Sequence, residues 1–151
     1  MAETPLTEPI DLRAPPRRRE RAPVLGAVAL GGGLGALGRY GLAELWPTGP
    51  HTFPWATFIT NVSGCLLIGV LMVLISEVWA VHRLIRPFLG VGVLGGFTTF
   101  STYAAETRAL LAPGTVWIAF AYLAGTLLAA MLAVIAGGWL TRAATGAGRR
   151  A

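Results

Sequence analysis

The sequence predicts an all-α membrane protein with four transmembrane helices. Of its 151 residues, 54% are hydrophobic and only 13% are charged, whereas about 25% of the residues in a typical soluble domain are charged. Apolar runs of about 20 residues recur along the chain, and a helix of that length crosses about 30 Å of hydrocarbon. A soluble domain of this size cannot bury so much apolar surface, so we expect a lipid bilayer to be its solvent.

The two ends of the chain differ in composition from the region between them. Residues 1–22 combine prolines with four acidic residues and five Arg, and they contain almost no core-forming side chains. This composition predicts a disordered N-terminal tail, and the absence of a short apolar stretch with a cleavage site argues against a secretory signal. Residues 23–142 form the predicted membrane domain, and residues 143–151 form a short basic tail.

Three of the four predicted spans are simple apolar helices. The first runs from about Val24 to Trp46 and is rich in glycine, the second from about Pro54 to Trp79, and the fourth from about Gly114 to Leu140. Indole rings favour the headgroup level of a bilayer, so tryptophans near the span ends support these boundaries. All five tryptophans lie there: Trp46, Trp55, Trp79, Trp117 and Trp139.

The third span begins near Leu84 and is unusual because its apolar part, Phe88–Leu94, is only about two turns long. It continues as Gly95-Gly96 and then as the hydroxyl-rich segment 98–102. Each glycine weakens a helix by about 1 kcal/mol, and hydroxyls can satisfy backbone groups that a break sets free. We therefore predict a helix broken near mid-membrane, where irregular backbone commonly forms ion sites. The alternative is a continuous helix whose hydroxyls bond back to their own turn.

Other polar groups also lie within the predicted spans. Asn61 is in the second span, and a buried amide there requires a partner, for which interhelical hydrogen bonding is the simplest explanation. In the fourth span Tyr122 and Thr126 are four residues apart and share one helix face. Small residues at the same spacing predict close helix packing; in the fourth span they are Ala121, Gly125, Ala129, Ala133 and Gly137.

The distribution of arginine predicts an orientation with both termini in the cytoplasm. Every basic residue is Arg, and this orientation places ten of the twelve on the cytoplasmic side, leaving Arg39 and Arg108 for the other side. The basic residues suit contact with anionic lipid. No basic stripe runs along any predicted element, so we expect no nucleic-acid partner.

Several functional classes are disfavoured by what the sequence lacks. Cys65 is the single cysteine, which excludes an intrachain disulfide, and no catalytic or metal-binding arrangement is evident, so we do not expect an enzyme. A proton-coupled four-helix exporter remains an alternative, although no carboxylate lies mid-membrane in spans one, two or four. A non-transporting scaffold is a further alternative, but it leaves the hydroxyl-rich segment unexplained.

Three segments closely resemble the motifs of the small bacterial fluoride channels called Fluc or CrcB. They are GGGLGALGRY (31–40), FPWATFITNVSGCLLIG (53–69) and GVLGGFTTFSTYAAE (92–106), and the resemblance extends over about residues 24–142. It implies a passive fluoride-selective channel that exports cytoplasmic fluoride across the bacterial plasma membrane. It also implies an antiparallel dimer with two pores and a structural sodium ion at the dimer centre.

The resemblance implies roles for individual residues. The backbone carbonyls of Gly95 and Thr98 would bind sodium. Tyr103 departs from the commoner phenylalanine of the family, so the role of its hydroxyl is open. The residues implied to line the pore or bind fluoride are Arg39, Asn61, Phe100, Ser101, Thr102, Tyr103, Glu106, Tyr122 and Thr126.

The arginine bias bears on the expected dimer. An antiparallel dimer of one chain requires subunits that insert in both orientations, whereas a ten-to-two split predicts a fixed orientation. We therefore expect the partner to be a second four-helix paralogue of opposite topology. The alternative is that the tail arginines are overridden during insertion and the chain pairs with itself.

Overall fold

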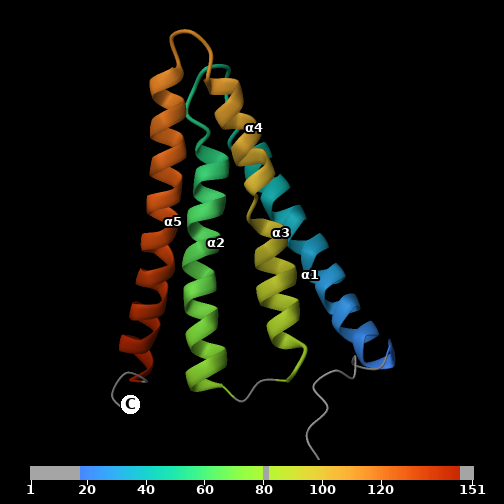
Figure 1. Ribbon diagram of the computed structural model, residues 1–151. Helices are drawn as coiled ribbons and strands as arrows, with labels where there is room; N and C mark the ends of the chain where they lie inside the picture. The colour runs from blue at the N-terminus through green and yellow to red at the C-terminus, as the bar shows by residue number, and fades with distance from the viewer. Residues whose placement is uncertain (1–17, 80–81, 147–151) are drawn as a thin grey trace, which may run out of the picture.

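The computed structural model describes residues 18–79 and 82–146, and in that part of the chain every regular element is helical. Four segments of 25, 24, 25 and 30 residues are long and apolar enough to cross a membrane, which confirms the four predicted spans (Figure 1). The elements in chain order are α1 (Arg18–Leu45), α2 (Trp55–Val73), η1 (Leu74–Val78), η2 (Arg86–Leu94), α3 (Gly95–Phe97), α4 (Phe100–Leu110) and α5 (Val116–Thr145).

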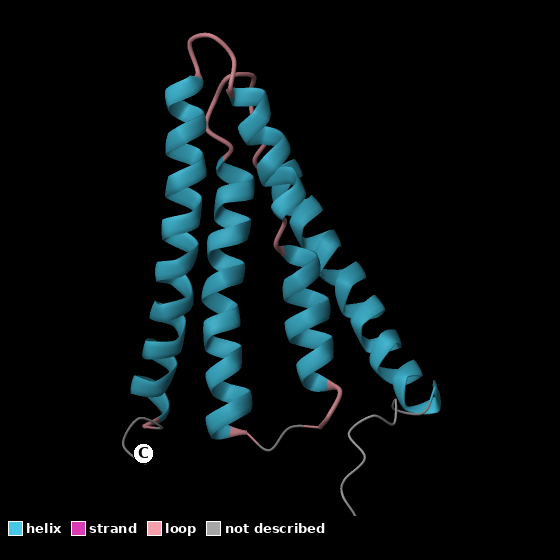
Figure 2. Cartoon of the chain, viewed as in Figure 1, coloured by secondary structure: helices cyan, strands magenta, loops and turns pink. Residues whose placement is uncertain are grey.

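Successive spans run in opposite directions, so the connecting loops alternate between the two ends of the bundle (Figures 1 and 2). The loops 46–54 and 111–115 lie at one end, and the start of α1 and the end of α5 lie at the other. Within the bundle α2 packs mainly against α5, and α1 packs mainly against η2 and α3. The α1 helix diverges from α5, so the bundle is widest at the end that holds the C-terminus.

Close packing of α1 against η2 and α3 depends on glycines in both segments. Gly31 and Gly35 are buried, and a Cβ added to Gly35 would overlap the backbone of Val93. In the opposite direction, a Cβ on Gly96 would overlap the backbone of Gly32. Small residues let helix backbones approach closely in membranes, where dispersion contacts replace the hydrophobic effect as the source of packing energy.

We expect Gly35→Ala to lower the stability of the protein by about 1–3 kcal/mol, because its methyl group would force α1 away from η2. The matched control is Gly33→Ala in the same helix, where an added Cβ has no neighbour within 4 Å. Thermal unfolding of both purified variants in detergent would test this difference. Equal unfolding temperatures would contradict the packing argument.

The two halves of α5 pack in different ways. In its C-terminal half Gly137 is buried, and an added Cβ would overlap the backbone of Leu66 in α2. Near its N-terminal half, aromatic side chains separate the helices, and a buried cluster contains Tyr103 and Tyr122. Only part of the predicted small-residue stripe therefore makes close contact, since Gly125 has open space around its Cα and Ala121 is exposed.

The helices extend beyond the predicted limits of the membrane domain at both ends. The α1 helix begins at Arg18, within the predicted tail, and α5 continues to Thr145. Arg, Glu and Ala favour helices, so a polar segment next to a span can continue its helix. At this end Arg142 and Glu77 form an ion pair of 2.6 Å between α5 and η1. The rest of the predicted tails, residues 1–17 and 147–151, lies outside the described residues.

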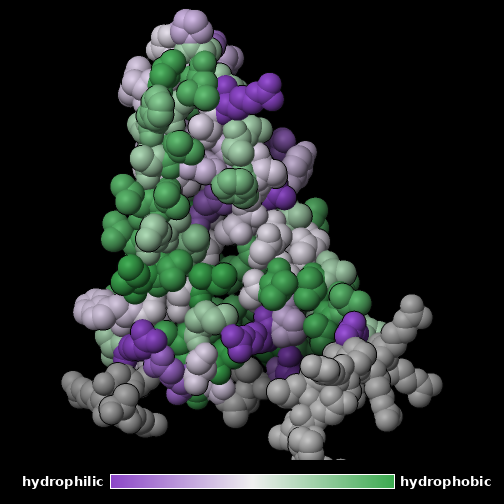
Figure 3. All heavy atoms as spheres, in the orientation of Figure 1, coloured by the Kyte–Doolittle hydropathy of each residue, from purple (hydrophilic) through white to green (hydrophobic). Residues whose placement is uncertain are grey.

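The outer surface of the bundle is largely apolar, as a lipid environment requires. Exposed leucines occur along α1 and α5, and Figure 3 shows hydrophobic side chains over most of the α5 face. The five tryptophans are between 49% and 70% exposed. They lie at or near helix ends, where indole rings can reach the headgroup level.

Candidate functional site

Two extended residues separate α3 from α4 (Figure 2). Thr98 has φ −73° and ψ 156°, and Thr99 has φ −147° and ψ 126°. Gly95 and Gly96 remain helical in α3, just before these residues. The hydroxyl residues, rather than the two glycines, therefore occupy the extended segment.

Asn61 of α2 binds the backbone of the extended segment through both ends of its amide group. Its Nδ2 donates to the carbonyl of Thr99 at 3.0 Å, and the N–H of Thr99 donates to its Oδ1 at 2.8 Å. Backbone N–H and C=O groups that are shielded from water need hydrogen-bond partners, and the Asn61 amide satisfies one of each in Thr99. Asn61 therefore holds Thr99 in its extended conformation.

The hydroxyls of the extended segment satisfy neighbouring backbone groups. Thr99 is the N-cap of α4, because its Oγ1 accepts a hydrogen bond from the N–H of Thr102 at 3.2 Å. Thr98 Oγ1 donates back to the carbonyl of Leu94 at 2.9 Å. For this one residue, the alternative expectation that the hydroxyls bond to the preceding helical turn is therefore confirmed. The Thr99 hydroxyl also donates a hydrogen bond to the Thr102 hydroxyl at 3.1 Å.

The two carbonyls implied to bind sodium have lost the donors that a continuous helix would give them. Gly95 would bond the N–H of Thr99, but that group donates to Asn61. Thr98 would bond the N–H of Thr102, but that group donates to Thr99 Oγ1. Carbonyl oxygens are hard ligands, and these two are not occupied by their helical donors, so they could bind a hard cation.

Glu106 of α4 connects three helices. Its two carboxylate oxygens accept hydrogen bonds from Thr57 Oγ1 of α2 at 2.9 Å and from the Tyr122 hydroxyl of α5 at 2.7 Å. Tyr122 is completely buried, so its hydroxyl depends on this contact. Thr57 was not predicted, although it is four residues before Asn61 and so lies on the same helix face.

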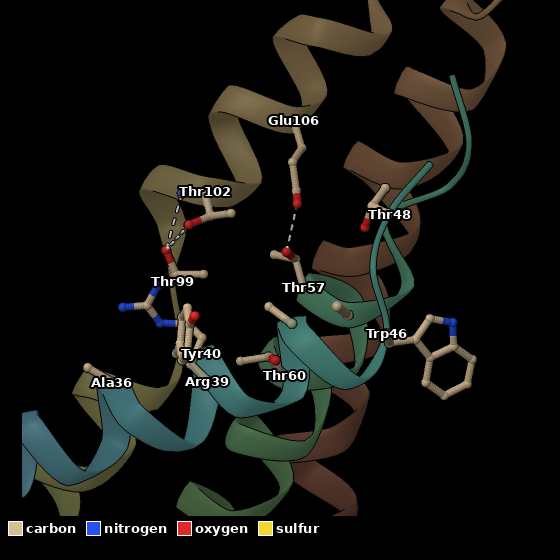
Figure 4. A pocket seen from close by; sticks show the side chains of 12 residues that line it. Ala36, Arg39, Tyr40, Trp46, Thr48, Thr57, Thr60, Thr99, Thr102 and Glu106 are labelled. Carbon is tan, nitrogen blue, oxygen red and sulfur yellow. Dashed lines mark hydrogen bonds between the residues drawn. The ribbon is translucent and has the colours of Figure 1, made fainter. Parts of the chain in front are cut away.

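A pocket of about 340 Å³ lies between α1, α2 and α4 (Figure 4). Arg39 reaches it from α1, and its Nε donates to the carbonyl of Gly96 at 3.3 Å. Glu106 and Thr102 enter from α4. The pocket therefore combines one guanidinium, one carboxylate and several hydroxyls. It is lined by Ala36, Arg39, Tyr40, Ala43, Trp46, Thr48, Ala56, Thr57, Thr60, Thr99, Thr102 and Glu106.

A second pocket, of about 290 Å³, lies between α2, α4 and α5 next to the extended segment. Four of the residues predicted to line the pore also line this pocket, although they come from three different helices: Asn61, Phe100, Tyr103 and Thr126. Its remaining wall is formed by Gly64, Cys65, Ile68, Thr98, Thr99, Leu127 and Ala130.

The aromatic residues of this region form a connected series. Tyr103 contacts Tyr122 edge to face, with ring centroids 5.1 Å apart, and its own centroid is 6.0 Å from that of Phe100. Phe100 is 79% exposed, so its ring projects from the chain. The Tyr103 hydroxyl donates to the carbonyl of Leu123 in α5 at 2.5 Å. This contact gives a role to the hydroxyl that distinguishes Tyr103 from phenylalanine.

The structure brings most of the predicted site residues into this region and leaves one at its edge. Ser101 is exposed, and its Oγ lies 3.3 Å from Thr99 Oγ1. Like Gly95 and Tyr122, it lines neither of the two pockets. Thr60 lines the first pocket and Cys65 the second, and neither was predicted. Both residues lie within an apolar span, where the sequence of a pocket-lining position resembles that of a core position.

Comparison with known proteins identifies the family of this chain and several relatives. The family described as "CrcB-like protein, Camphor Resistance (CrcB)" matches residues 26–138. A relative from Nocardia farcinica, named fluoride-specific ion channel FluC 2, is 61% identical over 127 residues, covering 84% of this chain and 91% of its own. A Streptomyces avermitilis protein of the same name is 57% identical over 122 residues (78% and 77%). Streptomyces coelicolor fluoride-specific ion channel FluC 1 is 56% identical over 124 residues (82% and 80%).

Proposed function

The chain belongs to the CrcB family of fluoride channels, which are not enzymes, and from this premise we propose that it conducts fluoride. Cytoplasmic fluoride would leave passively, down its gradient, across the bacterial plasma membrane. The four apolar spans make the chain a multi-pass membrane protein, as such a channel must be. The names of its relatives support fluoride as the ion.

The observation that carries this proposal is the extended segment inside a membrane-length span. Thr98 is twelve residues from Arg86 and twelve from Leu110, the two ends of that span. The helix therefore breaks near the middle of the bilayer in our proposal. Irregular backbone at that depth requires surrounding protein or a polar path, and here Asn61 and the hydroxyls surround it.

The residues around the extended segment suit an anion that is strongly hydrated. Such an ion must exchange water for hydrogen-bond donors, and its sites must stay weak enough for it to leave. Thr102 and Thr126 supply hydroxyls, and the rings of Phe100 and Tyr103 supply electropositive edges. We propose that the two pockets are stretches of one fluoride path. Arg39 and Glu106 line the stretch that is nearer the loop 46–54, Tyr122 lies behind Glu106 and bonds to it, and Ser101 lies at the edge of the path.

A structural sodium ion fits the carbonyls of Gly95 and Thr98, which have lost their helical donors. When bound, it would supply positive potential near the anion path without lying in it. Two carbonyls do not complete a coordination shell, and an antiparallel partner would supply two more. We therefore propose a dimer with two pores and sodium at its centre.

The arginine distribution supports a proposal about the partner. Ten of twelve arginines lie on one side if the N-terminus is cytoplasmic, which favours one fixed orientation. We propose that the partner is a paralogue of opposite topology, with pairing to a second copy as the alternative. Tagging both termini in cells should place both tags in the cytoplasm. Tags on both faces of the membrane would instead favour pairing with itself.

Fluoride efflux from proteoliposomes is the direct test of the function. We expect efflux down a fluoride gradient, from the chain alone or, if its orientation is fixed, only together with the paralogue. Exchange that requires a pH gradient would favour the proton-coupled exporter. The absence of flux under all of these conditions would contradict the channel and favour a scaffold.

A further inference from the structure

A further cavity lies between the first turns of α1 and the start of η2. Its volume is about 440 Å³, which is within the range of sites that hold small molecules. It shares no residue with the two pockets of the proposed fluoride path. Its wall is apolar throughout and consists of residues from the segments 23–30 and 84–88, which together we call the α1–η2 groove.

The groove exists because α1 and η2 touch at one level and separate toward the end of the bundle that holds the C-terminus (Figure 1). A Cβ added to Gly31 would overlap the backbone of Phe88, so the two backbones are in contact there. At Gly26, which lines the groove, an added Cβ has no neighbour within 4 Å. The wall extends along α1 from Pro23 to Leu30, which is about 10 Å of helix.

Arginines border the groove on both of its sides. Arg83 and Arg86 flank two residues of its wall, and Arg21 is two residues before the first wall residue of α1. All three side chains are exposed, and none of them takes part in an ion pair within the described part of the chain. An uncompensated positive charge therefore borders an apolar groove.

These arginines lie at the level where a bilayer holds its phosphate groups. The first and third membrane-length segments begin at Arg21 and Arg86. Trp79, four residues before Arg83, is 52% exposed directly after η1, and indole rings favour the headgroup level. The charged side chains can therefore reach phosphate groups while the groove lies among the acyl chains.

We propose that the α1–η2 groove and its arginines bind an anionic phospholipid. One acyl chain lies in the groove against Leu30 and Phe88, and the phosphate binds Arg83, Arg86 and Arg21, since a guanidinium group can bind phosphate through two hydrogen bonds. The positive charges favour a lipid with a net negative charge over a zwitterionic lipid, whose ammonium group they would repel. Lipid binding here is separate from fluoride conduction, so either one can fail without the other.

The test measures lipid binding to the purified full chain in detergent, by mass spectrometry of the intact complexes. The two lipids are phosphatidylglycerol and phosphatidylcholine with identical acyl chains. We expect the first phosphatidylglycerol to bind about thirtyfold more tightly, because each arginine near an anionic lipid contributes about fivefold. Replacing both Arg83 and Arg86 with Gln should remove most of this preference. The control is Arg108→Gln, an exposed position at the opposite end of the bundle, which should bind both lipids normally.

A second pair of variants tests the groove itself. Gly26→Leu places a side chain in the open space of the groove and should weaken the binding of both lipids severalfold, because the acyl chain loses its contacts there. Gly33→Leu adds the same side chain to the same helix, also into open space but outside the groove, and should bind as the original chain does. Thermal unfolding without added lipid should be the same for both variants.

Two results would overturn the inference. Equal affinities for the two lipids in the original chain would show that the arginines do not select an anionic headgroup. Unchanged binding in Gly26→Leu would show that the groove is covered by something other than an acyl chain, such as another part of the chain or a partner helix. If Gly26→Leu lowered the unfolding temperature, the variant that lacks Arg83 and Arg86 would still decide the outcome.

Discussion

Replacing Asn61 with Asp is expected to abolish fluoride flux. The substitution removes the Nδ2 donor that binds the carbonyl of Thr99, and it places a carboxylate beside the extended segment. At a separation of about 5 Å and an effective dielectric constant of about 20, two like charges repel by about 3 kcal/mol, which corresponds to more than a hundredfold in rate. Fluoride efflux from proteoliposomes measures the effect.

Two further variants separate the causes of this loss. Asn61→Leu removes both hydrogen bonds without adding charge, so it reports the positioning role of the amide alone. Ser63→Ala is the control, because the Ser63 hydroxyl only bonds back to its own helix, at 2.6 Å from the carbonyl of Ile59. We expect normal flux from Ser63→Ala. If Asn61→Asp conducts as well as this control, Asn61 does not lie beside the path.

Replacing Phe100 with Ile is expected to reduce flux by about fivefold, because a ring-edge contact is worth about 1 kcal/mol. The stability of the fold should remain nearly unchanged. The ring is 79% exposed and makes few contacts that stabilise the chain. The ring edge is lost from the second pocket, although a side chain of similar polarity remains. Fluoride efflux and thermal unfolding of the same preparation measure the two effects.

The control for Phe100→Ile is Leu132→Ile in α5, a side chain that is 66% exposed and lines neither pocket. It should change neither flux nor unfolding temperature. If Phe100→Ile conducts normally, the ring has no part in the path. If it unfolds at a much lower temperature than the control, the reduced flux would reflect damage to the fold.

The sequence best supported those predictions that concern a property of one continuous segment, such as its length, hydropathy or hydroxyl content. The four spans follow from apolar length and composition, and the tryptophans mark their ends independently of the hydropathy pattern. The hydroxyl-rich segment 98–102 marked the irregular part of the third span, although the extended residues lie just after the two glycines. The small-residue spacing of the fourth span predicted close packing along α5, and it overestimated that contact.

The site itself required relations between helices that the sequence does not contain. Asn61 and Thr99 are 38 residues apart, and Arg39 and Gly96 are 57 apart. Thr57 was missed because its partner, Glu106, lies on another helix. Likewise, the position of Cys65 within an apolar run gave no sign that it lines a pocket with Phe100.

The sequence by itself determined that the chain crosses a membrane four times and where its backbone is least regular. Both properties are local, since helix length, hydropathy and hydroxyl content are fixed within one segment. Only the tertiary structure decided which polar groups meet, because that depends on the rotation and separation of neighbouring helices. Glycines set that separation where backbones touch, and a shift of one turn would have separated Asn61 from Thr99.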